Sequence, residues 1–324
     1  MSRGRSSEFS PHLGVGYLKR VVRCYLLYVG FGLLGLGSPV FAVTELAVTF
    51  DDLPAHGASA PGMSRLDVAE QIIRTLKHHA VPEVYGFLNG RSLRDEPALR
   101  DVVRAWVAAG FRLGNHTYSH VNLKEVTAAQ YIADIARNEA LLTEFSLDAA
   151  WKVFRYPYLE SGETREKRQA VREWLAARGY RIAPVTVDFG DWAWNDPYAR
   201  CLGKRDEAGV ARLRQTFLAA AMDRLHASDA LARRIFDRPI KHILMLHVGA
   251  FDAVMLDELL RAYEAAGVRT VSLDSALRDP AYAVDPGLVP SGELLFLEQS
   301  ARVRSIQPPT AAPIPFTMLE SVCR

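Results

Sequence analysis

Side chains that can bind metal ions or transfer protons follow several short apolar segments of this 324-residue sequence. Asp51 and Asp52 come directly after the apolar segment 45–50. Adjacent residues that leave a strand point to opposite sides, so one carboxylate could bind a cation while its neighbour reaches over a substrate. A helix N-cap or a turn uses the same residue type, and this pair alone does not decide between the two interpretations.

Two histidines, His116 and His120, stand four residues apart. This spacing puts two imidazoles on one face if the segment forms a helical turn, as in metal-binding histidine pairs. The alternative is a pair of polar loop residues without a ligand. With a carboxylate from a second strand end, the set becomes two histidines and one carboxylate, which leaves coordination positions open for water and suits zinc or another divalent transition metal.

Three further groups also follow apolar segments. Arg155 ends an apolar strand pattern. Unless it is a surface arginine, its charge needs a partner, such as a carboxylate at the same end of the sheet. Trp192 follows the acid Asp191 and would form either an aromatic wall for a sugar ring or part of the core. His247 follows five apolar residues, and its place at a strand end favours an acid–base role over that of a core histidine.

Short apolar segments alternate with helical patterns through most of the chain, which predicts a parallel sheet covered by helices. The predicted strands are 45–50, 84–88, 111–114, 152–155, 181–187, 242–246 and 268–273, and the predicted helices are 64–76, 97–109, 128–145, 164–178, 207–236 and 253–266. Seven or eight such steps favour an α/β fold with a closed or nearly closed barrel over an open sheet. The polar groups above would then meet at one mouth, where the carboxyl ends of the strands lie.

The first 42 residues have the layout of a secretory signal peptide. Basic residues precede the apolar run 24–36, and Val40 and Ala42 occupy the −3 and −1 positions of a cleavage site. A retained membrane anchor is the alternative, but the run is short for a span of about 20 residues. We therefore expect an exported protein, periplasmic or secreted, with no stable membrane insertion after cleavage.

Residues 43–284 are expected to form the catalytic domain, and the proline-rich segment 285–324 is expected to be a tail that lies on the surface or is partly disordered. Cys24 belongs to the predicted signal peptide. Cys201 and Cys323 could pair in an oxidising compartment or remain as two free thiols, and the sequence favours neither.

The composition is that of an ordinary globular protein, with 49% hydrophobic and 23% charged residues. A formal net charge of +2 gives no indication of a nucleic-acid-binding protein, which would carry a strongly basic face. Nothing in the sequence indicates the oligomeric state.

Taken in order, these segments resemble the motifs of the polysaccharide deacetylase family, also called NodB-homology or carbohydrate esterase family four. The matches are T-F-D-D at 49–52, H-[ST]-x-x-H at 116–120, R-x-P-Y at 155–158 and D-x-x-D-W at 188–192. His247 matches the last motif, L-x-H, only in part, because Met245 stands where the family has leucine. The resemblance covers roughly residues 45–279, and the occurrence of all motifs in order makes it specific.

The resemblance implies a distorted (β/α) barrel of about seven parallel strands with a divalent metal ion at its mouth. Asp51 would be the general base, and Arg155 would hold it in place. Asp52, His116 and His120 would bind the metal, most often Zn²⁺, with Co²⁺ or Ni²⁺ as alternatives.

The same resemblance assigns the residues on the opposite side of the mouth. His247 would be the acid that protonates the leaving group, and Asp191 would tune it. Tyr158 would offer its backbone N–H to the oxyanion, and Trp192 would line the substrate groove.

The implied activity is hydrolysis of N-acetyl, or also O-acetyl, groups on a carbohydrate such as peptidoglycan, a chitooligosaccharide or xylan. Such an enzyme acts on carbon–nitrogen bonds other than peptide bonds. Two alternatives remain: a related amidase that acts on a non-sugar amide, and a silent member that binds glycans without turnover. The loop 53–63 and the long stretch 193–239 border the mouth and leave the substrate undecided.

Overall fold

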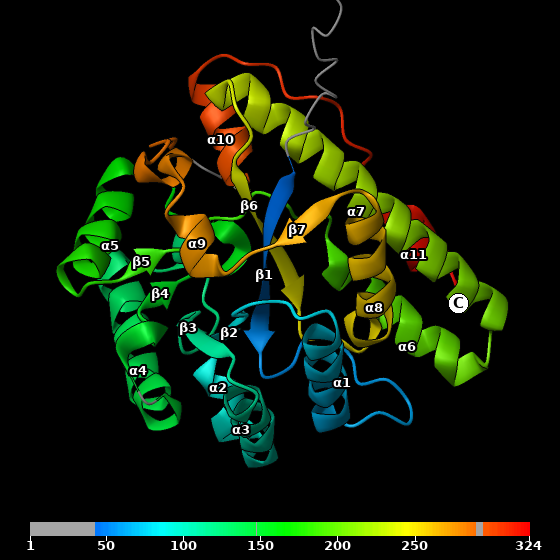
Figure 1. Cartoon of the computed structure of the whole chain (residues 1–324). Helices are drawn as coiled ribbons and strands as arrows, with labels where there is room; N and C mark the ends of the chain where they lie inside the picture. The colour runs from blue at the N-terminus through cyan, green and yellow to red at the C-terminus, as the bar shows by residue number, and fades with distance from the viewer. Residues whose placement is uncertain (1–42, 147, 290–293) are drawn as a thin grey trace, which may run out of the picture. The chain divides into compact units, whose positions relative to one another are not determined.

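The computed structural model describes residues 43–146, 148–289 and 294–324. The predicted signal peptide therefore lies outside the described residues. Residues 43–324 form one compact unit, whose arrangement is shown in Figure 1. No helix in this described part of the chain is long and apolar enough to cross a membrane.

Seven parallel strands form the central sheet, in the order β5-β4-β3-β2-β1-β6, and β7 pairs with the start of β1. The strands are β1 (Thr44–Leu53), β2 (Tyr85–Leu88), β3 (Arg112–Asn115), β4 (Val153–Phe154), β5 (Arg181–Ile182), β6 (Lys241–His247) and β7 (Val268–Thr270). β1 is the longest strand and pairs with β2, β6 and β7. Its apolar residues are buried on both faces, as expected for a parallel sheet between helices.

The sheet curls so that the segment after β5 reaches β6. Val187 forms an isolated parallel bridge with Leu244, and the backbone N–H of Thr186 donates to Ile243 O at 3.1 Å. The fold is therefore an α/β half-barrel, in agreement with the predicted distorted barrel of about seven strands. The predicted strand 181–187 is shorter than expected, because Pro184 cannot donate to a ladder.

Eleven α-helices cover this sheet in the described residues. They are α1 (Arg65–His78), α2 (Gly90–Asp95), α3 (Arg100–Ala108), α4 (Ala128–Phe145), α5 (Arg165–Ala177), α6 (Asn195–Lys204), α7 (Glu207–Phe236), α8 (Ala250–Ala265), α9 (Leu273–Leu277), α10 (Phe296–Val303) and α11 (Phe316–Ser321). Local sequence signals set their starts: Ser64 and Asp67 form a capping box at α1, and Thr127 and Gln130 form one at α4.

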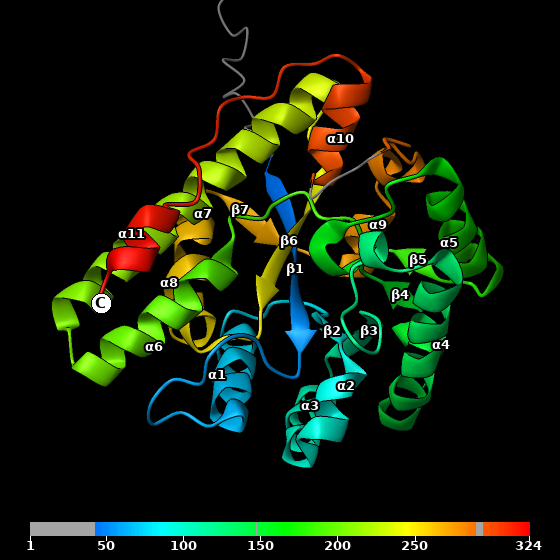
Figure 2. The same ribbon diagram turned by 180° about the vertical axis from the view of Figure 1, so that it is seen from behind.

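The C-terminal segment is more ordered than the sequence predicts. α10 packs against the end of α7, and α11 lies near the start of α7, as Figure 2 shows from behind. A disulfide joins Cys201 of α6 to Cys323, with the two Cα atoms 5.0 Å apart. Helices of six and eight residues are unstable by themselves, so packing and the disulfide, rather than a periodic pattern, explain them.

Candidate metal and acid–base site

The two aspartates at the end of β1 lie between the central strands. Asp51 pairs in register with His247 of β6 and is only 2% exposed. Asp52 adopts a left-handed backbone conformation with φ of 57°, which an aspartate tolerates better than most residues. This turn directs both carboxylates toward the same histidine: His116 Nε2 lies 3.8 Å from Asp51 Oδ2 and 3.7 Å from Asp52 Oδ1. The expectation that the two acids would point to opposite sides is thus not met.

The histidine pair meets Asp52 without a helical turn. Beyond β3 the chain runs through an irregular loop, in which Thr117 and His120 have φ of 62° and 53°. This loop brings the rings of His116 and His120 to 5.0 Å and places His120 Nε2 3.2 Å from Asp52 Oδ1. The proximity of the two rings follows from this loop rather than from helical spacing.

The donor set around Asp52 Oδ1 fits a divalent metal ion. Asp52 Oδ1 is buried and has no hydrogen-bond partner, although buried polar atoms are usually paired. The ligand atoms of Asp52, His116 and His120 all lie within 4.8 Å of one another. An unpaired carboxylate oxygen that faces two imidazole nitrogens is an arrangement that a cation would satisfy.

The protonation of His116 suits a metal ligand. Its Nδ1 donates to the Arg155 carbonyl oxygen at 2.8 Å, which leaves Nε2 without a proton on the side of Asp52. Burial lowers the pKa of His116 to about 4, although the nearby carboxylates oppose this. His116 is therefore neutral at pH 7, which is the form that binds metals.

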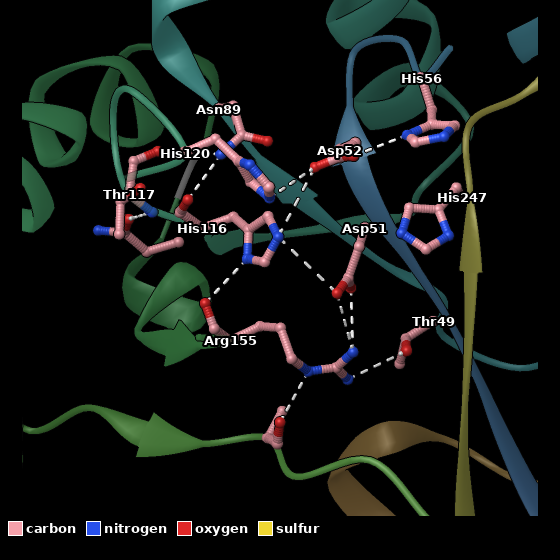
Figure 3. A network of polar contacts seen from close by, with 12 residues as sticks. Thr49, Asp51, Asp52, His56, Asn89, His116, Thr117, His120, Arg155 and His247 are labelled. Atoms are coloured by element: carbon pink, nitrogen blue, oxygen red, sulfur yellow. Dashed lines mark hydrogen bonds and ion pairs between the residues drawn. The ribbon is translucent and has the colours of Figure 1, made fainter. Parts of the chain in front are cut away.

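Asp51 forms a buried ion pair with Arg155, which Figure 3 shows beneath the histidines. Arg155 Nη1 donates to Asp51 Oδ1 at 3.0 Å and to Oδ2 at 3.2 Å. The other donors of the guanidinium reach Ala183 O at 2.7 Å and Thr49 Oγ1 at 3.2 Å. Arg155 is 1% exposed, so the alternative of a surface arginine is excluded.

His247 forms a second pair with Asp191, which begins the short 3₁₀ helix Asp191–Trp194. His247 Nδ1 lies 3.0 Å from Asp191 Oδ1, and the backbone N–H of His247 donates to Asp191 Oδ2 at 2.7 Å. Burial would lower the pKa of His247, but the charge and hydrogen bond of Asp191 outweigh it and raise the pKa to about 10. His247 is therefore a protonated imidazolium at neutral pH.

The sequence did not single out His56, a third histidine that faces Asp52. His56 Nδ1 lies 2.8 Å from Asp52 Oδ2, and the rings of His56 and His247 are 4.6 Å apart. The His56 backbone N–H donates to Val248 O at 2.9 Å, and Arg65 Nη1 donates to His56 O at 3.0 Å. The only sequence signal was its place in the loop 53–63 at the mouth.

The hydrogen bond from His56 also lowers the pKa of Asp52. Burial would raise the pKa of Asp52, but the hydrogen bond from His56 and the charges of the other histidines hold it well below its ordinary value. Oδ2 of Asp52 thus forms a hydrogen bond with His56, whereas Oδ1 faces His116 and His120. This division of the two oxygens gives the carboxylate a fixed orientation.

Residues 42–179 of the chain match the family described as polysaccharide deacetylase. They include β1 with its two aspartates, the histidine pair and Arg155. This part of the chain belongs to the polysaccharide deacetylase family.

Two curated relatives of this deacetylase family match part of the chain. A peptidoglycan-N-acetylglucosamine deacetylase of Bacillus cereus is 32% identical over 148 residues, which is 46% of this chain and 46% of that protein. A chitin deacetylase of Colletotrichum lindemuthianum is 26% identical over 167 residues, which is 50% of this chain and 60% of that protein. The two matches therefore span 46% and 60% of the lengths of these curated relatives.

Solved structures share the fold of the polysaccharide deacetylase domain. A peptidoglycan N-acetylglucosamine deacetylase is 24% identical, with a TM-score of 0.50 over 73% of this chain and 89% of that chain. A pseudoenzyme of carbohydrate esterase family four from Bacillus anthracis is 17% identical, with a TM-score of 0.51 over 73% of this chain and 66% of that chain. The family thus includes a pseudoenzyme, so membership by itself does not establish turnover.

Two aromatic residues of the deacetylase motifs lie at the surface beside the polar site. Tyr158, with φ of 56°, is 49% exposed, and its ring lies 4.6 Å from that of His120. Trp192 is 40% exposed, which rules out the alternative that it belongs to the core. Its ring lies 5.9 Å from that of Phe316 of α11, an exposed aromatic residue that the sequence did not single out.

Proposed function

We propose that this protein is a metal-dependent hydrolase that removes N-acetyl groups from a carbohydrate. The observation that carries the proposal is the unpaired Asp52 Oδ1 that faces two imidazole nitrogens, with a base candidate and a protonated histidine beside it. Two histidines and one carboxylate suit Zn²⁺ best, with Co²⁺ and Ni²⁺ as alternatives. A divalent ion held by Asp52, His116 and His120 would supply Lewis acidity to polarise the acetyl carbonyl.

Asp51 is the proposed general base. Its carboxylate lies at the same mouth, and both oxygens receive hydrogen bonds from the Arg155 guanidinium. This pairing keeps the carboxylate oriented, so that it can accept a proton from the attacking water molecule. Arg155 acts only through Asp51 and is a positioning residue in this scheme.

His247 is the proposed general acid. As an imidazolium it can give its Nε2 proton to the leaving amine, while Asp191 keeps the ring oriented through Nδ1. Tyr158 would donate its backbone N–H to the oxyanion of the tetrahedral state. Trp192 would contact a sugar ring through its exposed face.

The proposed substrate is an acetylated amino sugar of the cell envelope or the surroundings, such as peptidoglycan or a chitooligosaccharide. Two curated relatives carry the names of deacetylases of these polymers. Acetylated xylan, which carries O-acetyl groups, is the corresponding substrate for removal of O-acetyl groups. Export to the periplasm or the medium, after removal of residues 1–42, would place the protein beside such substrates.

The test is acetate release by the purified protein, stripped of metal with a chelator and then reloaded with Zn²⁺ or Co²⁺. N-acetylglucosamine oligomers, peptidoglycan fragments and acetylated xylan are the substrates. We expect acetate only after reloading, and none from Asp51→Asn or His116→Ala. His226→Ala, a change of an exposed histidine on α7, is the matched control and should retain activity.

Two outcomes would contradict the proposal. Turnover of small non-sugar amides without acetate release from any glycan would identify an amidase. Metal bound at one equivalent, with glycan binding but no turnover of any substrate, would identify a silent member, a state that occurs among the structural relatives.

A further inference from the structure

Asp252 is a buried acid that the proposed mechanism does not use. It lies in the first turn of α8, five residues after His247, and is 1% exposed. Neither of its carboxyl oxygens receives a hydrogen bond from an N–H or O–H donor of the described residues. An ionised carboxylate in such surroundings would be strongly unfavourable, so its environment needs an explanation.

The neighbour of Asp252 is the carboxyl group of Asp191. The two carboxyl groups lie within hydrogen-bonding reach of each other, and a hydrogen bond between them requires one of the acids to carry a proton. Asp191 already accepts hydrogen bonds from the backbone N–H and the Nδ1 of His247. The proton therefore belongs to Asp252, because two carboxylates in a dry interior cannot both be ionised.

The direction of the pKa shifts agrees with this geometry. Burial and the charge of Asp191 raise the pKa of Asp252 well above its ordinary value. The pKa of Asp191 is lowered, because the charge and hydrogen bonds of His247 and the hydrogen bond from Asp252 outweigh the effect of burial.

Other polar groups around the three residues do not supply an alternative partner for Asp252. Asn195 of α6 uses its Oδ1 to accept from the backbone N–H groups of Ala250 and Phe251. A Cβ on Gly249 would lie 2.9 Å from Asp252 Oδ2, so the turn closes tightly over the carboxyl group. The remaining charged or titratable groups that act on the three residues from other elements are Asp51, Asp52, His56 and Asp188.

We propose that Asp252 is a positioning residue that acts as a neutral carboxylic acid and donates its O–H to Asp191. The chain of hydrogen bonds then runs from Asp252 to Asp191 and on to His247. A carboxylate that receives an additional hydrogen bond is a weaker base, so Asp252 limits how strongly Asp191 holds the proton on His247. The effect on catalysis rests on the proposed function, whereas the hydrogen-bond chain itself does not.

Two substitutions separate this role from others. Asp252→Asn keeps a neutral donor, and Asp252→Leu removes it while keeping the branching at Cγ. We expect the pKa of His247 to be unchanged in the Asn variant and to rise by about one pH unit in the Leu variant, a tenfold change in proton affinity. The measurement is an NMR titration of the ¹³C,¹⁵N-labelled imidazole in the metal-free protein, which needs no turnover.

The proposal is overturned by either of two results. A lower pKa of His247 in the Asn variant would show that Asp252 is an anion whose charge was removed. An unchanged pKa in both variants would show that Asp252 has only a structural role.

A direct observation covers the case in which the Leu variant does not fold. In the wild-type protein, the ¹³C resonance of the Asp252 carboxyl group should keep the position of a protonated acid between about pH 5 and 8, where an ordinary aspartate is ionised. A carboxylate resonance at pH 7 would refute the proposal. If the protein releases acetate, the alkaline limb of the kcat profile should follow the pKa of His247 in each variant, and an inactive protein would refute the proposed function without touching the NMR result.

Discussion

The ion pair between Asp51 and Arg155 allows a quantitative test of how dry the interior of this site is. Both side chains are almost fully buried, and their atoms approach to 3.0 Å. Two unit charges about 4 Å apart attract each other by about 4 kcal/mol at an effective dielectric constant of about 20. Removal of one partner leaves the other charge buried and unpaired, which costs about 3–5 kcal/mol.

A double-mutant cycle measures this interaction. We expect Asp51→Asn and Arg155→Met each to lower the free energy of unfolding by about 3–5 kcal/mol. The double variant should lose about as much as one single variant, which gives a coupling energy of about 3–4 kcal/mol. Equilibrium unfolding in urea at pH 7, with a chelator present, provides the four values.

The matched control is the exposed pair of Arg74 and Glu70 on α1, whose atoms lie 3.5 Å apart. Its coupling energy should be about 0.3–0.5 kcal/mol, because water screens an exposed pair on a helix. A coupling energy below about 1 kcal/mol for the buried pair would refute the reasoning, since it would mean that water reaches both charges.

Three further predictions follow from other contacts. Substitution of His56 by alanine should weaken Zn²⁺ binding by about 10–100-fold, because Oδ2 of Asp52, the proposed metal ligand, loses its hydrogen bond. Isothermal titration measures the affinity, and equal affinity would contradict the positioning role. His79 lies 2.9 Å from both Asp257 and Glu264, and these carboxylates raise its pKa despite partial burial. Its pairing should stabilise the fold fully below about pH 6.5 and lose effect as the pH rises through the raised pKa, so unfolding curves of His79→Gln and wild type should converge at alkaline pH. Replacement of Cys323 by serine should lower the free energy of unfolding by about 2–4 kcal/mol, and an unchanged urea midpoint would show that the disulfide leaves the unfolded chain unconstrained.

Elements with long apolar periodicity could be predicted from the sequence. The pattern predicts both ends of α4 and α7, since capping residues fix such segments locally, and it predicts the start of β1 within one residue, although β1 continues three residues beyond the predicted end. α10 and α11 could not be predicted, because α10 depends on its packing against α7, and α11 depends on its contact with the 3₁₀ helix Asp191–Trp194 and on the disulfide.

The residues of the site also divide into those that could be identified from the sequence and those that could not. Asp51, His116 and His247 could be identified because each follows an apolar strand, so chain position alone puts it at the mouth. His56 could not be identified, since its position depends on how the loop after β1 folds back toward Val248. Asp252 has the position of an ordinary acid in the first turn of a helix, and only the three-dimensional contact with Asp191 gives it a different role.

The central position of β1 has a consequence for how the chain folds during synthesis. β1 is the first strand of the described residues, yet the hydroxyl of Thr49 donates to Leu244 O across 195 residues of sequence. At about 5–20 residues per second, β6 leaves the ribosome about 10–40 seconds after β1. We therefore expect Asp52, His116 and His120 to be translated well before His247, and the edge of β1 to remain uncovered until its last partner strand is made.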